Sequence, residues 1–202
     1  MSTAAGKNRL VDIDTSRPVW ERFFTVAPLV LIGTTDPDGS PDFAPKHMVT
    51  PMGWQNYFGF VCCPAHSTCS NIQRSGVFTV SYPKPSQVLY SSLAASPRLE
   101  GHKPVLDYFT TFPAQKITGQ LIEEAYLYFE CHHFKTVEGF GPNCLITGEI
   151  VAAYAEEDFL RSSELDDQEL VHDSPLLAYL APGRFAAIER SNAFPFPAHM
   201  KK

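Results

Sequence analysis

Residues 29–49, LVLIGTTDPDGSPDFAPKHMV, contain the pattern that decides the fold. Apolar residues dominate positions 29–35, and a turn rich in Pro, Asp and Gly follows at 36–40. These residue types favour a turn, because Pro fixes φ, Asp hydrogen-bonds to the nearby backbone and Gly tolerates a positive φ. A second extended stretch at 42–49 follows the turn. The segment is therefore predicted to form a β-hairpin.

Alternating apolar segments recur along the rest of the chain. They predict further strands at 57–62, 77–82, 126–137, 144–154 and 184–189. Short helices are expected at 69–75, 86–95 and 105–109. Seventeen prolines against twelve glycines cut the chain into short pieces, which disfavours a helical bundle. The predicted fold class is mainly β (α+β), an antiparallel barrel with short inserted helices.

Length and charge restrict the class of protein. A chain of 202 residues suits one domain, with a barrel core at about 26–190, an N-terminal arm at 1–20 and a C-terminal tail at 191–202. The net charge of −6 argues against a nucleic-acid binder or a polybasic membrane binder. No apolar run approaches the ~20 residues of a membrane-spanning helix. The polar start of the chain lacks a signal peptide's apolar stretch, so a cytoplasmic protein is expected.

The cysteines point to free thiols. Their number is five, which is odd, and Cys62 and Cys63 are neighbours, so they do not outline a disulfide framework. The series Cys63, His66 and Cys69 has the residue types of a zinc site, but its spacing is irregular for one, and no metal is predicted.

Polar side chains concentrate between residues 44 and 72. They include Lys46 and His47 at the end of one strand, and His66, Ser67, Thr68 and Asn71 between a strand end and a helix start. A helix N-terminus presents unpaired N–H groups and a partial positive charge, so it stabilises an anion. Ser67 or Thr68 is expected to cap this helix, and Gly76 suits its C-terminal end. These polar residues, together with the start of the helix, predict a phosphate site. The alternative interpretation is an ordinary helix cap beside a solvated histidine.

Several stretches also follow the order seen in a known family. They are PLVLIGTTDPDG at 28–39, AP at 44–45, HSTCSNI at 66–72, GVFTV at 76–80, EEAYLYFEC at 123–131, GEIV at 148–151 and DSPLLAYLAPGRF at 173–185. The ordered set spans most of the chain and resembles the flavin reductase-like family. That resemblance implies an FMN-binding split β-barrel.

The resemblance also implies residue roles. The FMN phosphate would be held by Thr68 and Asn71, with His66 and Ser67 nearby. The flavin ring would lie on Lys46, His47, Met48 and Val49, largely on their backbone, with Val61, Cys62 and Cys63 flanking its other edge. The family further implies a homodimer with the flavin near the subunit interface.

The expected function is therefore an FMN-dependent oxidoreductase that takes a hydride from NADH or NADPH. It would pass electrons to a partner monooxygenase or another acceptor. Such transfer needs mainly two stacked rings, so no separate catalytic residue is predicted.

One departure from the family keeps two alternatives open. Relatives carry Gly-Asp-His at a turn where this chain has Gly141, Pro142 and Asn143, and an amide can neither take up a proton nor carry charge. The alternatives are a non-catalytic FMN-binding electron carrier of the flavoredoxin kind and a barrel interaction domain without cofactor.

Overall fold

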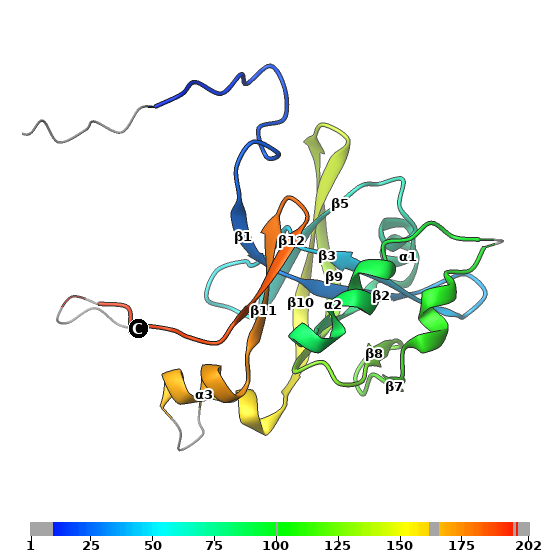
Figure 1. Ribbon diagram of the computed structural model, residues 1–202. Coiled ribbons are helices and arrows are strands. Elements are labelled where there is room, and N and C mark those ends of the chain that lie inside the picture. The colour runs from blue at the N-terminus through cyan, green and yellow to red at the C-terminus, as the bar shows by residue number, and fades with distance from the viewer. Residues whose placement is uncertain (1–9, 100, 162–165, 196, 198–202) are drawn as a thin grey trace, which may run out of the picture.

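A strongly curled seven-stranded antiparallel sheet forms the centre of the computed structural model (Figure 1), which describes residues 10–99, 101–161, 166–195 and 197. In sheet order its strands are β3 (Pro41–Lys46), β2 (Val30–Thr35), β6 (Val77–Tyr82), β9 (Leu127–Phe140), β10 (Asn143–Ala155), β5 (Tyr57–Cys62) and β4 (Val49–Pro51). Strands β3 and β4 are the two edges of this sheet, yet only two residues separate them in the chain. The two edges must therefore approach each other at this connection, so the sheet curls strongly and resembles a partly open barrel.

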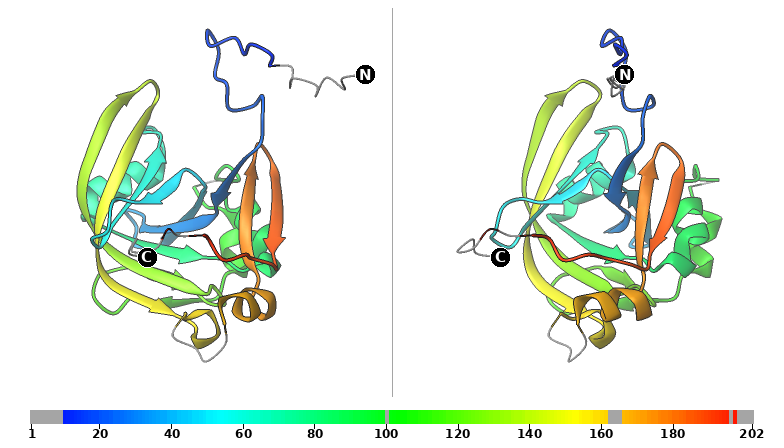
Figure 2. Two further views of the ribbon diagram at one scale, coloured as in Figure 1. Left: turned by 90° about the vertical axis from the view of Figure 1, so that its left-hand side faces the viewer. Right: turned by 60° about the vertical axis from the view of Figure 1, so that its left-hand side comes forward.

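A three-stranded sheet completes the structure. It contains β1 (Thr25–Pro28), β11 (Leu176–Ala181) and β12 (Arg184–Ile188), paired antiparallel in that order. Figure 2 shows it standing opposite the long β9–β10 hairpin, which extends beyond the other strands. A separate small ladder joins β7 (Thr111–Pro113) to β8 (Gln120–Ile122).

Short helices fill the connections. The described residues contain α1 (Ser67–Ser75), α2 (Val88–Leu93) and α3 (Asp167–Asp173), with 3-10 turns at η1 (Pro85–Gln87), η2 (Pro104–Tyr108) and η3 (Glu157–Phe159). Helix α1 ends as expected at Gly76, whose φ of 72° is left-handed and whose N–H donates to Ile72 O at 2.8 Å.

The core lies on the concave face of the curled sheet, under α1. It consists mainly of aromatic and aliphatic side chains with 2% exposure or less, among them Phe60, Phe78 and Ile72. Gly148 permits a close approach of the sheet to this core, because a Cβ there would lie 2.5 Å from Phe78 Cζ. Bulges between β9 and β10 add to the twist, so the long hairpin bends with the barrel.

The predicted elements compare as follows. The first hairpin and strands β5, β6, β9, β10 and β12 are confirmed. The expected strand at 42–49 is wrong in one respect, since it breaks at residues 47–48 into β3 and β4. The helix expected at 105–109 is a 3-10 turn, and β1, β7, β8 and α3 were not expected. Parts of the expected arm (1–9) and tail (196, 198–202) lie outside the described residues.

Candidate functional site

The break between β3 and β4 brings two predicted site segments together. Met48 lies in the break, and its carbonyl oxygen accepts the N–H of Val61 at 2.9 Å. Val49 pairs with Phe60 in the β4–β5 ladder and packs on the core. The segments 46–49 and 61–63 are thus neighbours in space, as a common binding surface requires.

The side chains of this surface have distinct environments. Met48 is half-exposed, Cys62 is buried and Cys63 is partly buried. Burial raises the pKa of the Cys62 thiol, and the charge of Lys46 opposes this shift. Lys46 is therefore close enough to place a positive charge over the end of β5.

The N-terminus of α1 differs from the sequence prediction. Neither Ser67 nor Thr68 caps the helix; the N-cap residue is His66, whose exposed side chain makes no capping hydrogen bond. The backbone N–H groups of Ser67 and Thr68 have no acceptor among the described residues. These unpaired donors make the helix start suitable for an anion.

Thr68 and Asn71 lie on the buried side of α1, each 2% exposed. The Asn71 amide nitrogen donates to Thr34 Oγ1 at 3.1 Å and to Asp36 Oδ1 at 2.8 Å, so both of its hydrogens are used within the protein. No described group hydrogen-bonds the Thr68 hydroxyl. The Thr68 hydroxyl thus has no use within the described structure, whereas Asn71 holds α1 against the end of β2.

A charged cluster that the sequence did not predict surrounds this helix start. Ser67 Oγ donates to Asp42 Oδ2 at 3.0 Å, and Arg98 Nη2 lies 2.9 Å from the same oxygen and 3.4 Å from Ser67 Oγ. Arg98 also pairs with Asp36 at 2.7 Å, and this hydrogen bond raises the pKa of Arg98. Lys103 Nζ lies 2.8 Å from Asp42 Oδ1 in an ion pair without hydrogen-bond geometry. Two carboxylates balance two cations, so the cluster keeps Arg98 beside Ser67 without a net negative charge.

Strand β3 connects the two halves of the candidate site. Asp42, near its start, contacts the first turn of α1, and Lys46, at its end, lies beside Cys62. Lys46 lies four positions after Asp42 along the extended strand, a distance of about 13 Å. An extended ligand with an anionic end and a flat apolar end fits this arrangement.

Beyond β3, His47 packs on Tyr179 of β11, with ring centroids 4.5 Å apart. Burial and the charge of Lys46 lower the pKa of His47. A cavity of about 340 Å³ opens beside these rings, between the end of β3, α2 and the β11–β12 hairpin. The stretch at 173–185 matched the order seen in the family, but no contact of this stretch with His47 was predicted.

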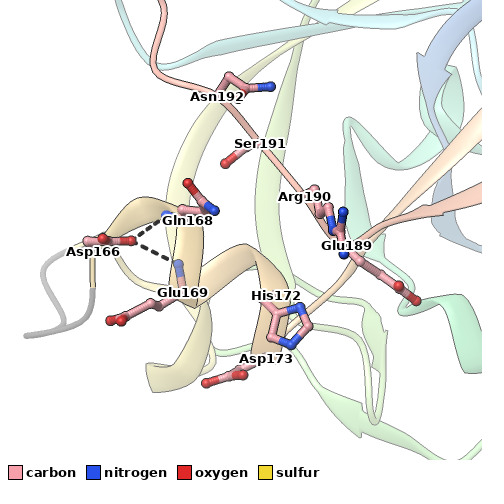
Figure 3. Close-up of a pocket in the computed structure, with 9 residues that line it drawn as sticks. All are labelled: Asp166, Gln168, Glu169, His172, Asp173, Glu189, Arg190, Ser191 and Asn192. Atoms are coloured by element: carbon pink, nitrogen blue, oxygen red, sulfur yellow. Dashed lines mark hydrogen bonds between the residues drawn. The ribbon is translucent and has the colours of Figure 1, made fainter.

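A larger cavity, of about 1020 Å³, lies between α3 and residues 189–192 (Figure 3). None of the eleven predicted site residues lines it. Its lining includes four carboxylates, and Asp166 uses one oxygen to cap α3 through the N–H groups of Gln168 and Glu169. These four carboxylates disfavour a phosphate in this cavity, so the segments around β3 remain the candidate site. The described residues contain no group of three or more His, Cys, Asp or Glu side chains arranged to hold a metal, and no helix among them is long and apolar enough to cross a membrane.

Solved structures resemble this fold over nearly the whole chain. Flavoredoxin from Methanosarcina acetivorans has a TM-score of 0.75 and 21% identity, with 94% of this chain and 97% of that chain covered. Nitrilotriacetate monooxygenase component B from Bacillus cereus has a TM-score of 0.79 and 14% identity, with 93% and 100% covered. The 2-nitrobenzoate 2-nitroreductase from Pseudomonas fluorescens has a TM-score of 0.74 and 19% identity, with 87% of each chain covered.

These likenesses, all below 25% identity, show the fold, which is the split barrel. A search of curated protein sequences finds no match. The sequence profile described as "Flavin reductase like domain" matches residues 23–182. That match includes β3, the break at 47–48 and α1, and the chain accordingly belongs to the flavin reductase-like family.

Proposed function

We propose that this protein is an FMN-dependent oxidoreductase that accepts a hydride from NADH or NADPH. The observation that carries the proposal is at the start of α1, where the N–H groups of Ser67 and Thr68 and the Thr68 hydroxyl have no partner among the described residues and the Arg98 guanidinium contacts Ser67. Hydrogen bonds to a charged group contribute about 1.5–3 kcal/mol each, so three or four would hold a phosphate firmly.

The groups proposed to donate hydrogen bonds to the phosphate differ from those predicted from the sequence. Thr68 stays a direct ligand, through its hydroxyl and its backbone N–H, and Ser67 contributes its N–H. Asn71 acts indirectly, since its amide positions α1 against Asp36. Arg98 joins the set because it already contacts Ser67. His66 stands at the helix start and borders the same space.

The other end of the site suits the flavin ring. The ring is proposed to lie along Lys46, His47, Met48 and Val49, with Val61, Cys62 and Cys63 at its other edge. FMN, when bound, supplies a ring that takes up and releases a hydride. Lys46 supplies a positive charge at this surface, which stabilises negative charge on a reduced ring. The apolar residues exclude water from the reacting face.

A second candidate is an electron carrier that binds FMN but reacts poorly with nicotinamides. The position of Asn143 favours this electron carrier. Asn143 directly precedes Cys144, and Cys144 pairs with Cys62 in the β5–β10 ladder. The turn where relatives carry a histidine is therefore next to the candidate site, and here it offers an amide that cannot take up a proton.

The acceptor and the assembly complete the proposal. The component B and nitroreductase neighbours support delivery of electrons to a partner monooxygenase or to another acceptor. Exposed apolar residues on the described part of the arm, which projects from the body in Figure 2, support a homodimer: Leu10 is 92%, Val11 77% and Trp20 59% exposed. Five free cysteines suit the reducing cytoplasm.

The test is an absorbance spectrum of the purified protein, repeated after anaerobic addition of NADH and of NADPH. The oxidoreductase should be yellow and should bleach with a reduced nicotinamide. A yellow protein that bleaches with dithionite but with neither nicotinamide is the carrier. A colourless protein that gains no thermal stability from added FMN contradicts both, since a ligand bound only by the native state must stabilise it.

A further inference from the structure

The cavity beside His47 has the composition of a small-molecule pocket. Its volume of about 340 Å³ is near the lower end for ligand pockets and suits one or two rings rather than a dinucleotide. Leu29, Pro45, Val88 and Ala95 give it apolar walls. A ligand there must be mostly apolar.

Rings form a further part of the lining. Tyr179 and Phe185 are cross-strand partners in the β11–β12 ladder, and Tyr179 also packs on His47. The Tyr179 hydroxyl accepts the N–H of Gly183 at 2.9 Å, which fixes the ring to the turn of its own hairpin. Aromatic rings prefer offset or edge-on contact with other rings, so these walls favour a flat conjugated ligand.

One permanent charge faces this cavity. Arg184 is exposed and has no ion-pair partner in the described part of the chain, and no Asp or Glu is among the described residues that line the cavity. The lowered pKa of His47 leaves its imidazole neutral at neutral pH. A guanidinium presents paired N–H donors that match a carboxylate, so the pocket selects for a single anionic group.

From these observations we propose that the cavity between β3, α2 and the β11–β12 hairpin binds an aromatic monocarboxylate, with the ring between Tyr179 and the apolar walls and the carboxylate on Arg184. His47 belongs both to this cavity and to the proposed flavin surface, and Pro45 lines the cavity next to that surface in the chain. The ligand would be the substrate of the flavin only if FMN binds on residues 46–49, beside this cavity. This part of the proposal therefore rests on the proposed function.

The test uses benzoate as the probe, with benzamide as its neutral counterpart, in calorimetric titrations of the whole chain. Benzoate should bind about tenfold or more tightly than benzamide, since charge-assisted hydrogen bonds are lost in the amide. Arg184→Gln should abolish this preference. Arg190→Gln, a second exposed arginine that does not line the cavity, should preserve it.

A second variant tests the location. Ser92 is exposed on α2 and lines the cavity, so Ser92→Trp should fill the space and weaken benzoate and benzamide alike. Equal binding of benzoate and benzamide by the native chain, or unchanged benzoate binding in either Arg184→Gln or Ser92→Trp, overturns the proposal.

The titrations are run on flavin-free and FMN-loaded protein. Benzoate should bind both forms and shift the visible absorbance band of the loaded form. Competition between FMN and benzoate would assign the cavity to the flavin and overturn the proposal. If benzoate binds through Arg184 while FMN does not bind at all, the proposed function fails and the pocket stands.

Discussion

Ser67 and Asp42, 25 residues apart in the chain, are joined by a hydrogen bond of 3.0 Å from Ser67 Oγ to Asp42 Oδ2. Asp42 is 1% exposed and also pairs with Arg98 and Lys103. One carboxylate thus ties the first turn of α1, strand β3 and the loop after α2 together. The candidate phosphate site depends on this junction.

Asp42→Asn should destabilise the protein strongly. The substitution leaves Lys103, which is only 8% exposed, without its counter-charge, and removal of one partner from a buried ion pair costs about 3–5 kcal/mol. The free energy of unfolding from urea titration measures the effect. Asp158→Asn, at an exposed position in η3, should change it by less than about 0.5 kcal/mol. If the Asp42 variant and this control had the same free energy of unfolding, the ion pairs of Asp42 would not stabilise the protein.

Glu130 makes a second buried anchor, on β9. Its carboxylate is 0% exposed and accepts backbone N–H groups from Gln115, Lys116 and Ile117 at 2.8, 2.6 and 3.1 Å. Glu130→Gln turns an amide donor toward these donors, so we expect a loss of about 2 kcal/mol or more in unfolding free energy. Glu138→Gln, exposed on the same strand, is the control. Faster hydrogen exchange at residues 115–117 should accompany the loss, and unchanged exchange would contradict it.

His47 should titrate below the ordinary histidine pKa of 6.5, because burial and the charge of Lys46 lower its pKa. Below pH 6.5 the unfolded chain then binds more protons at this residue than the folded chain does. Its contribution to stability is therefore complete above pH 6.5 and is lost as the pH falls below that value.

Proton NMR of the His47 ring checks this shift. Lys46→Gln should raise the His47 pKa part of the way toward 6.5, since burial remains. Lys135→Gln should leave it unchanged. A His47 pKa at or above 6.5 in the native protein contradicts the structure at the β3–β11 contact.

The five thiols should react unequally with an aromatic disulfide reagent. Cys62, Cys69, Cys131 and Cys144 are buried, and burial raises the pKa of Cys62, Cys69 and Cys131, whereas Cys63 is partly exposed. Only the thiolate attacks, so one equivalent should react rapidly in native protein and all five after unfolding. Cys63→Ser should remove the rapid phase. Two or more rapid equivalents would show that the core beside α1 opens.

Local patterns predicted much of the fold. The turn at 36–40 and the alternation in β5, β6, β9 and β10 gave the antiparallel sheet, because these signals lie within single segments. The break at 47–48 could not be predicted, since it arises where the two edges of the curled sheet meet. Strand β1 is four residues long and is fixed by pairing with residues of β11 that follow 150 or more positions later in the chain.

The candidate site shows the same division. Candidate residues could be named from the sequence where they are local, as in the loop before α1, and their chemistry stays a prediction. The role of Asn71 was not predicted, because its amide is used by Thr34 and Asp36, 37 and 35 residues earlier. Arg98, Lys103 and Tyr179 join through tertiary contacts, and their sequence neighbourhoods carry no motif that indicates those contacts.

The proposed phosphate site at the start of α1 is tested by comparing the affinities of the protein for FMN and riboflavin, which differ only in the phosphate. The native protein should bind FMN about tenfold or more tightly than riboflavin. Thr68→Val should reduce that ratio and leave riboflavin binding unchanged, whereas Ser70→Ala, exposed on the same helix, should preserve the ratio. Equal affinities for FMN and riboflavin in the native protein would contradict the account.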